Sequence, residues 1–308
     1  MTNEYLDIEK KIGLSLNYKT FGLPKGEGET VLILHALTGN STVTGENGWW
    51  KEIVGYDKAI DLNKNHVVAI DVPGNGVNGQ FIEDINQYDA YLIAGVIVDG
   101  LKSNGYHKVD KAFGGSLGGG LLWEIIIDNP NWIGQVFIIA ANYKTTPWLK
   151  GITHTQNEIL KNSKTSIIDA RKLAMLFYRS PEGFDSKFSE NKQASEWLDY
   201  HGKALDQRFD FRSYRFMNHL LGSINATEGY ESFSDAILPI RTNIVQVGIN
   251  SDILFSAKDN IDTHIELRKL NKASVYEEIK SVHGHDAFLI ESKQLEKIVK
   301  RHINIKKR

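Results

Sequence analysis

The stretch Lys111-Ala-Phe-Gly-Gly-Ser-Leu-Gly-Gly-Gly120 is an apolar run that ends in glycines around a single serine. Within it Gly114, Ser116 and Gly118 form the pattern G-x-S-x-G, which is typical of a nucleophile elbow. In such an elbow the serine lies on a strained turn between a strand and a helix, and small neighbours let the two backbones pass closely. A glycine-rich turn without catalytic function explains the same pattern, so the interpretation depends on partners elsewhere in the chain.

The residues on both sides of this serine predict a strand before it and a helix after it. Val109 to Phe113 is short and apolar, and Leu117 to Asp128 has the length of a buried helix that stops near Asn129-Pro130. Farther out, the pattern predicts strands at 14–21, 30–34, 66–71, 133–141, 242–248 and 273–279, and helices at 88–103, 258–271 and 292–302. Because strands and helices alternate, we expect an α/β fold with a mostly parallel central sheet and helices on both faces.

The alternation stops between Thr146 and Phe233, where the chain turns helical and polar. We therefore expect a core domain made of residues 1–145 and 234–308, with residues 146–233 inserted into it as a helical lid. An insertion at this point lies over the carboxyl ends of the strands, where open α/β sheets bind ligands.

Composition limits the classes of function. The chain has 308 residues, a net charge of −2 and no cysteine, which excludes disulfides, thiolate catalysis and cysteine-ligated zinc. A charge so close to zero favours a small-molecule substrate over nucleic acid or an acidic membrane. No metal-ligand pattern is visible, so we expect no metal and no permanently bound cofactor. Met1 to Lys11 is polar and charged, and no apolar run reaches the length of a membrane span, so we expect a cytoplasmic protein.

A serine hydroxyl needs a base to take its proton and an acid to orient that base. In hydrolase-type sites these residues follow the serine in the order acid, then histidine. Asp252 follows a late predicted strand, and Ser281-Val-His-Gly-His-Asp-Ala-Phe288 follows the last one. We choose Asp252 as the acid and His285 as the base, and we interpret His283 as a surface histidine.

Acyl transfer also needs backbone N–H groups that stabilise the oxyanion, each worth about 3 kcal/mol of the barrier. The residue after the nucleophile, Leu117, supplies one of them, and the loop after the strand at 30–34 supplies the other, for which we choose Leu37. His35 in the same loop is interpreted as a residue that shapes the loop.

The chain carries several longer motifs that can be compared with known families. In the predicted core they are His35-Ala-Leu-Thr-Gly39, Gly48-Trp-Trp50, the elbow from Gly114 to Gly119, Ser251-Asp-Ile-Leu-Phe255 and Gly284-His-Asp-Ala-Phe-Leu289. In the predicted lid they are Ala170 to Ser180, Gly183 to Phe188, Leu198 to Gly202, Arg208-Phe-Asp210 and Ser213-Tyr214. Together these motifs resemble the homoserine O-acetyltransferase family of α/β-hydrolase-fold enzymes. The resemblance covers nearly the whole chain and implies an α/β-hydrolase fold with Ser116, Asp252 and His285 as its catalytic triad.

The resemblance also implies a reaction and a set of substrate contacts. Enzymes of this family move an acetyl group, or in some members a succinyl group, from coenzyme A to the hydroxyl of homoserine through an acyl-serine intermediate, in methionine biosynthesis. The acyl donor is a co-substrate, acetyl-CoA or succinyl-CoA. By the resemblance Arg171 and Tyr178 contact the acceptor, and Thr38 lies near it. An amino-acid acceptor needs a cationic and an anionic group, for which we choose Arg171 for its carboxylate and Asp286 for its ammonium group. A homodimer is implied as well.

The chain departs from the family pattern at four places, one of which is a shorter segment between Gln156 and Arg171. Asp71-Val-Pro-Gly-Asn-Gly-Val-Asn-Gly-Gln80 replaces a loop that usually starts with asparagine, Gly222 to Gly229 replaces a G-R-G-R-G-like stretch, and Gly120 stands where methionine is common. These differences leave acyl-donor entry and acceptor identity open. The alternatives are therefore a serine O-acyltransferase, or an esterase or thioesterase that uses the same triad with water as acceptor.

Two further hypotheses come from other classes of function. A binding module with an idle hydrolase fold is disfavoured by the intact serine, acid and base. Gly74-Asn-Gly-Val-Asn-Gly79 has the spacing G-x-G-x-x-G of a dinucleotide site, but the sequence predicts neither a helix start after it nor a well-placed acidic residue.

Overall fold

A computed structural model describes residues 3–7 and 15–303 of the chain. Most of the polar N-terminal stretch from which we expected a cytoplasmic protein lies outside these residues, as does the end of the predicted core at 304–308. Within the described ranges, no helix combines the length and the apolar character needed to cross a membrane.

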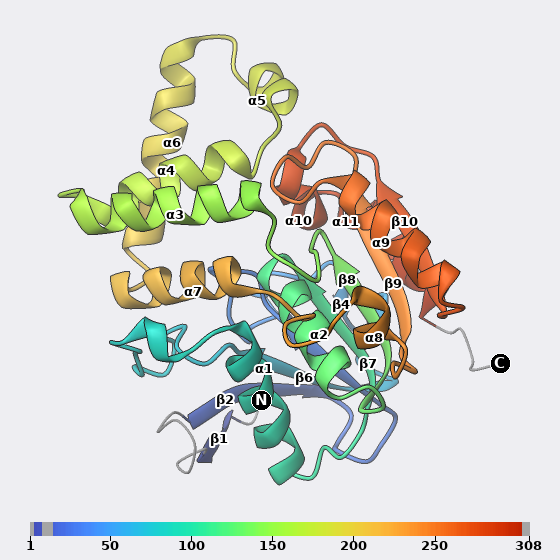
Figure 1. The fold of residues 1–308 in the computed structure, drawn as a ribbon. Coiled ribbons are helices and arrows are strands. Elements are labelled where there is room, and N and C mark those ends of the chain that lie inside the picture. The colour runs from blue at the N-terminus through green and yellow to red at the C-terminus, as the bar shows by residue number, and fades with distance from the viewer. Residues whose placement is uncertain (1–2, 8–14, 304–308) are drawn as a thin grey trace.

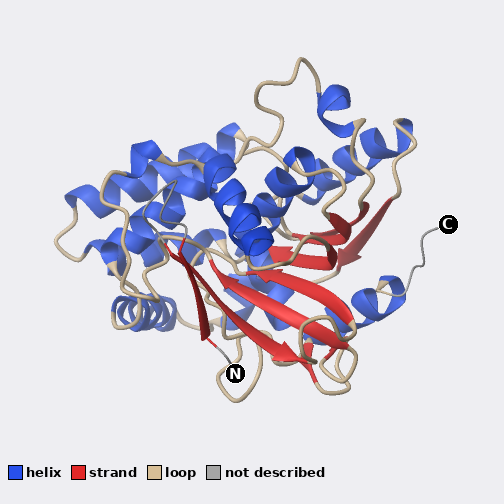
Figure 2. Cartoon of the chain, turned by 90° about the horizontal axis from the view of Figure 1, so that it is seen from below, coloured by secondary structure: helices blue, strands red, loops and turns tan. Residues whose placement is uncertain are grey.

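The centre of the molecule is an eight-stranded sheet with the strand order β1-β2-β6-β3-β7-β8-β9-β10 (Figure 2). The strands β3 (Glu29–Leu34), β6 (Asn65–Asp71), β7 (Val109–Gly115), β8 (Ile133–Ile139), β9 (Asn243–Ile249) and β10 (Ser274–Ile279) are parallel, while β1 (Asn3–Asp7) and β2 (Ser15–Gly22) form an antiparallel edge. Since all six parallel strands run the same way, the loops that follow them meet at one edge of the sheet.

Helices cover both faces of this sheet, so its inner parallel strands are mostly buried, whereas four of the six residues of the edge strand β10 are half-buried. On one face the apolar core includes α1 (Ala90–Ser103), α2 (Leu117–Asp128) and α9 (Ala257–Lys269). On the other face it includes α11 (Ser292–His302) and the segment 43–62, which contains the two-residue strands β4 (Val54–Gly55) and β5 (Ile60–Asp61). Short helical turns lie at η1 (Ile85–Gln87), η2 (Gly284–Asp286) and α10 (Ala287–Ile290).

Between β8 and β9 all the named elements are helices, and Figure 1 shows those within residues 147–223 gathered on one side of the molecule, with the short helix at 233–237 apart from them. These elements are α3 (Pro147–Asn162), α4 (Ser166–Phe177), α5 (Pro181–Lys187), α6 (Asn191–Asp206), α7 (Phe211–Ser223) and α8 (Phe233–Ile237). Figure 1 shows α5 and α6 farthest from the sheet, with α3, α4 and α7 nearer to it.

The predicted α/β architecture is confirmed, and the predicted strands and helices are present with small shifts at their ends. The prediction missed β1, β4 and β5, which are short and have no long apolar run to mark them. The G-x-G-x-x-G loop does not open a helix, because α1 begins only at Ala90. Instead, a Cβ built on Gly74 would lie 2.5 Å from the Phe216 ring of α7, so the loop packs beneath a helix.

Candidate active site

Ser116 lies on a sharp turn between β7 and α2. Its φ of 54° and ψ of −123° belong to a region that residues other than glycine rarely adopt, and such strain persists only where the surroundings impose it. Its backbone N–H donates to Ile139 O of the neighbouring strand over 3.0 Å, and only 4% of the residue is exposed. This is the strained strand-to-helix turn that the G-x-S-x-G pattern predicts.

The glycines around Ser116 allow three close approaches, two to backbone atoms and one to a side chain. A Cβ on Gly114 would lie 2.4 Å from Gly118 O, and a Cβ on Gly118 would lie 2.3 Å from Leu34 O at the end of β3. At Gly120 a Cβ would meet the Ile224 side chain at 2.1 Å. The glycine found where methionine is common in the resembling family is thus matched by an isoleucine from the segment after α7.

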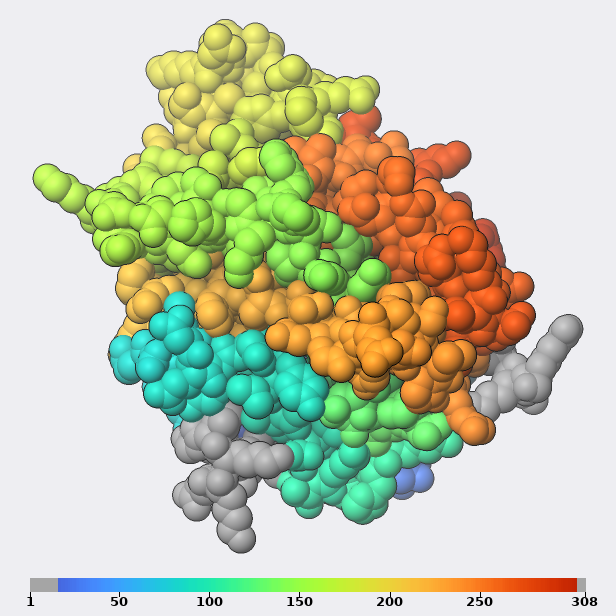
Figure 3. Space-filling view, viewed as in Figure 1, coloured from blue at the N-terminus to red at the C-terminus, as the bar shows by residue number. Residues whose placement is uncertain are grey.

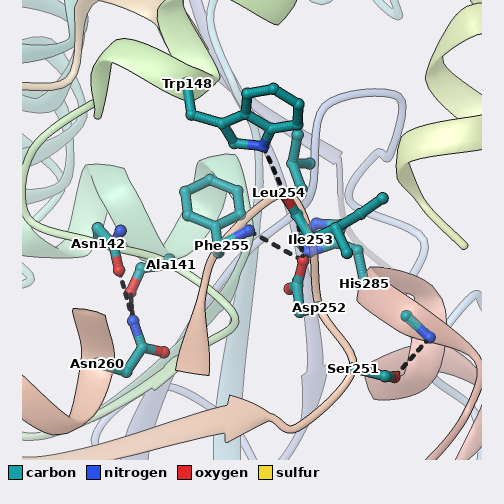
Figure 4. Close-up of polar contacts among 11 residues, drawn as sticks. Ala141, Asn142, Trp148, Ser251, Asp252, Ile253, Leu254, Phe255, Asn260 and His285 are labelled. Carbon is teal, nitrogen blue, oxygen red and sulfur yellow. Dashed lines mark hydrogen bonds and ion pairs between the residues drawn. The ribbon is translucent and has the colours of Figure 1, made fainter. Parts of the chain in front are cut away.

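Asp252 and His285 form a buried hydrogen-bonded pair. His285 Nδ1 lies 2.7 Å from Asp252 Oδ2, and the other carboxylate oxygen, Oδ1, accepts the backbone N–H groups of Leu254 at 2.7 Å and Phe255 at 2.9 Å (Figure 4). Because Nδ1 faces the carboxylate, Nε2 is the nitrogen available for a proton from another group.

The charge on His285 is set by opposing effects. Burial disfavours the imidazolium, but the carboxylate of Asp252, with a smaller contribution from Asp286, outweighs burial and raises the pKa of His285 above its ordinary value. His283, by contrast, precedes the turn η2 and is bonded through its backbone N–H to Ser281 Oγ.

The loop that carries His285 packs against the end of β7, just before Ser116. A Cβ on Gly115 would lie 2.8 Å from the Phe288 ring, whose centroid is 5.6 Å from that of His285. The sheet order places β7, β8, β9 and β10 side by side, so Ser116, Asp252 and His285 all follow strands at the same edge.

The loop after β3 holds its backbone in a fixed orientation. Ala36 O accepts His35 Nδ1 at 2.7 Å and Gly39 N–H at 2.9 Å, while His35 Nε2 accepts the N–H of Val72 at 2.9 Å. Because Nε2 accepts, the proton of this imidazole is on Nδ1. The C=O and N–H of a trans peptide point in opposite directions, so fixing Ala36 O also fixes the N–H of Leu37.

The second predicted oxyanion donor is at the start of a helix. Leu117 is the first residue of α2, and the first N–H groups of a helix have no acceptor within it. Both predicted donors, Leu37 and Leu117, therefore belong to segments that meet where Gly118 approaches the end of β3.

Asp71, which departs from the resembling family, has a structural role in the same region. Its carboxylate accepts Asn17 Nδ2 at 2.5 Å, and Ser41 N and Oγ at 2.7 and 2.9 Å. It thus anchors the end of the loop after β3 to two strands.

The predicted acceptor contacts gather around His285. The Arg171 guanidinium carbon lies 5.2 Å from the Tyr178 ring centroid, and that ring lies 5.7 Å from the His285 ring. Asp286 donates its backbone N–H to Tyr178 O over 3.0 Å, and its side chain is 16% exposed. The structure therefore brings together Arg171, Tyr178 and Asp286, whereas Thr38 lies in the loop after β3.

Three residues that the sequence analysis did not assign connect the helices after β8 to these loops. Arg179 Nη2 lies 3.3 Å from Asp286 Oδ2, Arg208 Nη1 donates to Thr38 O over 3.0 Å, and Trp148 Nε1 donates to Ile253 O over 2.6 Å. Figure 4 shows the Trp148 indole aimed at the segment beside Asp252. Arg179 adjoins Tyr178 in the sequence, which is the one signal that could have drawn attention to it.

Metal-ligating side chains do not gather in the part of the chain that the structure describes. Among residues 3–7 and 15–303, no group of three or more His, Cys, Asp or Glu side chains could hold a metal ion. The groups that this site offers for chemistry are a serine, an imidazole, carboxylates and guanidinium groups.

The fold and the strained serine turn define the class of protein: residues 29–292 match the family model described as alpha/beta hydrolase fold, and the chain belongs to this family. Among the proteins of this fold family, the chain is similar in sequence to a group that shares one name. It is 29% identical to the homoserine O-acetyltransferase of Cyclobacterium marinum over 92% of this chain and 88% of that protein, and 28% identical to that of Thermus thermophilus over 92% and 84%. The resemblance seen in the sequence motifs is thereby confirmed.

Solved structures agree on the fold. A homoserine O-acetyltransferase from Bacillus anthracis superposes with a TM-score of 0.86 at 16% identity, covering 99% of this chain and 96% of that one. Esterase E22 superposes with a TM-score of 0.83 at 15% identity, covering 98% and 97%. Since transferases and esterases share this fold, the fold alone does not decide between the two activities.

Proposed function

We propose that the chain is an acyltransferase that moves an acetyl or succinyl group from coenzyme A to the hydroxyl of L-homoserine. The observation that carries this proposal is the cluster of Arg171, Tyr178 and Asp286 beside His285, because a hydrolase of simple esters needs no groups for an amino-acid acceptor. The similarity to proteins named homoserine O-acetyltransferase over most of the chain supports it.

In the first half-reaction Ser116 Oγ attacks the thioester carbonyl while His285 Nε2 takes the hydroxyl proton. The carbonyl oxygen becomes an oxyanion, which the N–H groups of Leu37 and Leu117 stabilise. When the tetrahedral intermediate collapses, the carbon–sulfur bond breaks and His285 returns the proton to the leaving thiolate. The products are free coenzyme A and acyl-Ser116.

In the second half-reaction His285 takes the proton of the homoserine hydroxyl, whose oxygen attacks the acyl-serine carbonyl. Collapse breaks the bond to Ser116 Oγ, and the proton passes to that oxygen. Asp252 stabilises the imidazolium in both steps and keeps Nδ1 protonated. Arg171 binds the acceptor carboxylate, Asp286 the ammonium, and Tyr178 and Thr38 complete the acceptor pocket.

Further proposals concern the helical segment, the location and assembly of the protein, and its co-substrate. We propose that residues 146–233 act as a lid that keeps water from the acyl-enzyme. We also propose that the protein works in the cytoplasm as a homodimer, in methionine biosynthesis, with acetyl-CoA or succinyl-CoA as co-substrate and no permanently bound cofactor.

The proposal predicts that release of coenzyme A thiol from acetyl-CoA depends on homoserine. Wild-type enzyme is tested with homoserine, with serine and with water alone, and Ser116→Ala is the blank. Faster release with serine makes the enzyme a serine O-acyltransferase, and equal release with and without amino acid makes it a hydrolase. Repeating the assay with succinyl-CoA identifies the acyl group.

Arg171→Ala is expected to raise the KM for homoserine by about 100-fold, which matches the loss of a charge-assisted pair worth roughly 3 kcal/mol. The rate at which p-nitrophenyl acetate acylates Ser116 should stay within about threefold of wild type, since that ester carries no carboxylate. An unchanged KM for homoserine would remove Arg171 from the acceptor site.

The pH dependence of acylation is expected to report the pKa of His285. The base must be neutral to take a proton, so activity falls as pH drops through its pKa, and the raised pKa places this acid limb above the ordinary histidine value of 6.5. Asp286→Asn should move the limb to lower pH, because it removes a negative charge that raises the pKa. The profile of acylation rate by p-nitrophenyl acetate tests both statements, and a limb that stays in place in the variant contradicts the second.

A further inference from the structure

Three side chains donate hydrogen bonds to carbonyl groups of alternate residues in the loop after β3. His35 Nδ1 donates to Ala36 O over 2.7 Å, Arg208 Nη1 to Thr38 O over 3.0 Å, and Trp49 Nε1 to Asn40 O over 2.8 Å. His35 and Trp49 lie in or near this loop in the sequence. Arg208 comes from the helical segment between β8 and β9, 170 positions away in the sequence.

The bond from Arg208 acts on a peptide two positions along the chain from the one that carries the predicted oxyanion donor, the N–H of Leu37. Thr38 O and Gly39 N–H belong to one planar peptide, and Gly39 N–H donates to Ala36 O over 2.9 Å. Ala36 O in turn belongs to the peptide that carries the N–H of Leu37. The hydrogen bond from Arg208 to Thr38 O therefore restrains the short turn that determines the direction of the Leu37 N–H.

Arg208 is not explained by an ion pair. In the described part of the chain neither Arg208 nor Arg171 has a carboxylate within salt-bridge distance. Although Arg208 is exposed as a whole residue, partial burial of its guanidinium and then the charge of Arg171 lower its pKa. Its protein contact is the carbonyl of Thr38.

We infer that Arg208 is a positioning residue for the oxyanion hole, which makes the orientation of the Leu37 N–H depend on the segment between β8 and β9. This inference rests on the proposed role of Leu37 and not on the identity of the acyl acceptor. A positioning role affects both half-reactions alike, because each passes through an oxyanion at the same place.

The test measures the rate of Ser116 acylation by p-nitrophenyl acetate and the steady-state transfer from acetyl-CoA to homoserine. Arg208→Met is expected to lower both rates by about 10-fold, less than the 10²- to 10³-fold loss when an oxyanion donor is removed outright. The KM for homoserine should change by less than about threefold. Arg208→Lys should recover part of both rates, since its ammonium group reaches a carbonyl with poorer geometry.

Arg212→Met is the matched control. Arg212 lies close to Arg208 in the sequence, but its contacts are Asp210 at 3.0 Å, Glu83 at 3.2 Å and the Phe81 ring. Both rates should therefore stay near wild type in this variant. Circular dichroism of each variant gives the folded fraction, so that rates are compared per folded molecule.

Two results would overturn the inference. A raised KM for homoserine with unchanged acylation would show that Arg208 binds the acceptor, and a lowered Tm with unchanged acylation would show that it only stabilises the fold. A wild-type enzyme that is acylated but transfers nothing to homoserine contradicts the proposed function alone. In that case the ratio of acylation rates between Arg208→Met and wild type still decides the role of Arg208.

Discussion

Asp252→Asn is expected to lower kcat by roughly 10⁴-fold, the loss that the same substitution causes in a Ser-His-Asp protease triad. The reason lies in the hydrogen bonds that the Asp252 carboxylate makes. Asp252 Oδ1 accepts two backbone N–H groups, from Leu254 and Phe255, and Oδ2 faces His285 Nδ1. In the asparagine variant the two N–H donors keep the amide oxygen at the Oδ1 position, so the NH₂ group faces His285.

An NH₂ group at that position needs an acceptor, so His285 Nδ1 has to give up its proton. The imidazole then carries its proton on Nε2, the nitrogen that should receive the proton of Ser116. The base is present and correctly placed but in the wrong tautomer. Because both backbone hydrogen bonds remain, the Tm of the variant should stay close to that of wild type.

The measurement is kcat for acyl transfer together with the acylation rate by p-nitrophenyl acetate. Asp262→Asn removes a carboxylate from the following helix, α9, where Asp262 pairs with Lys258 and is 54% exposed in its side chain. It should leave both rates unchanged. If Asp252→Asn retained kcat within about tenfold of wild type, Asp252 would not be the orienting acid.

Much of this site could be predicted from the sequence because its parts follow strands. Ser116, Asp252 and His285 each come after an apolar run whose end the sequence marks, and parallel strands bring such ends to one edge. The hydrogen bond between Asp252 and His285 agrees with the order predicted from the motifs. The choice of His285 over His283 also agrees with it, since the bond to Asp252 is made by His285.

The contacts of the segment between β8 and β9 could not be predicted in this way. Trp148, Arg179 and Arg208 lie on or beside polar helices, where neither periodicity nor spacing indicates what a side chain touches. Their partners are backbone carbonyls or a carboxylate in loops more than a hundred positions away. Only tertiary packing brings them together.

Hydrogen bonds from the segment between β8 and β9 reach the loops that follow β3, β9 and β10. Trp148 bonds the segment after Asp252, Ser180 Oγ bonds Val282 O at 2.5 Å beside His285, and Arg208 bonds Thr38 O. Ile224 fills the space over Gly120 in α2. Figure 3 shows the green and yellow surface of this segment meeting the orange and red surface of the chain after β9. The segment thus contacts the loops from which the proposed catalytic groups project.

Gly118→Ala is expected to lower the free energy of unfolding by about 3 kcal/mol, the upper part of the usual range for overpacking, and to reduce acylation by more than about 100-fold. A Cβ at this position would lie 2.3 Å from Leu34 O and 2.8 Å from His35 O, and both atoms are main chain. The end of β3 must therefore move away from α2. That movement carries the loop with Leu37 away from Ser116, so stability and oxyanion stabilisation are lost together.

Gly151→Ala is the matched control, because Gly151 also lies within a helix, α3, but a Cβ there meets nothing within 4 Å. Helix propensity alone favours alanine at both positions by about 0.5–1 kcal/mol. Chemical denaturation should therefore show a gain in stability for Gly151→Ala and a loss for Gly118→Ala. If Gly118→Ala were as stable and as active as wild type, the close approach of α2 to β3 would not be required, and the second glycine of the G-x-S-x-G pattern would have no structural reason in this protein.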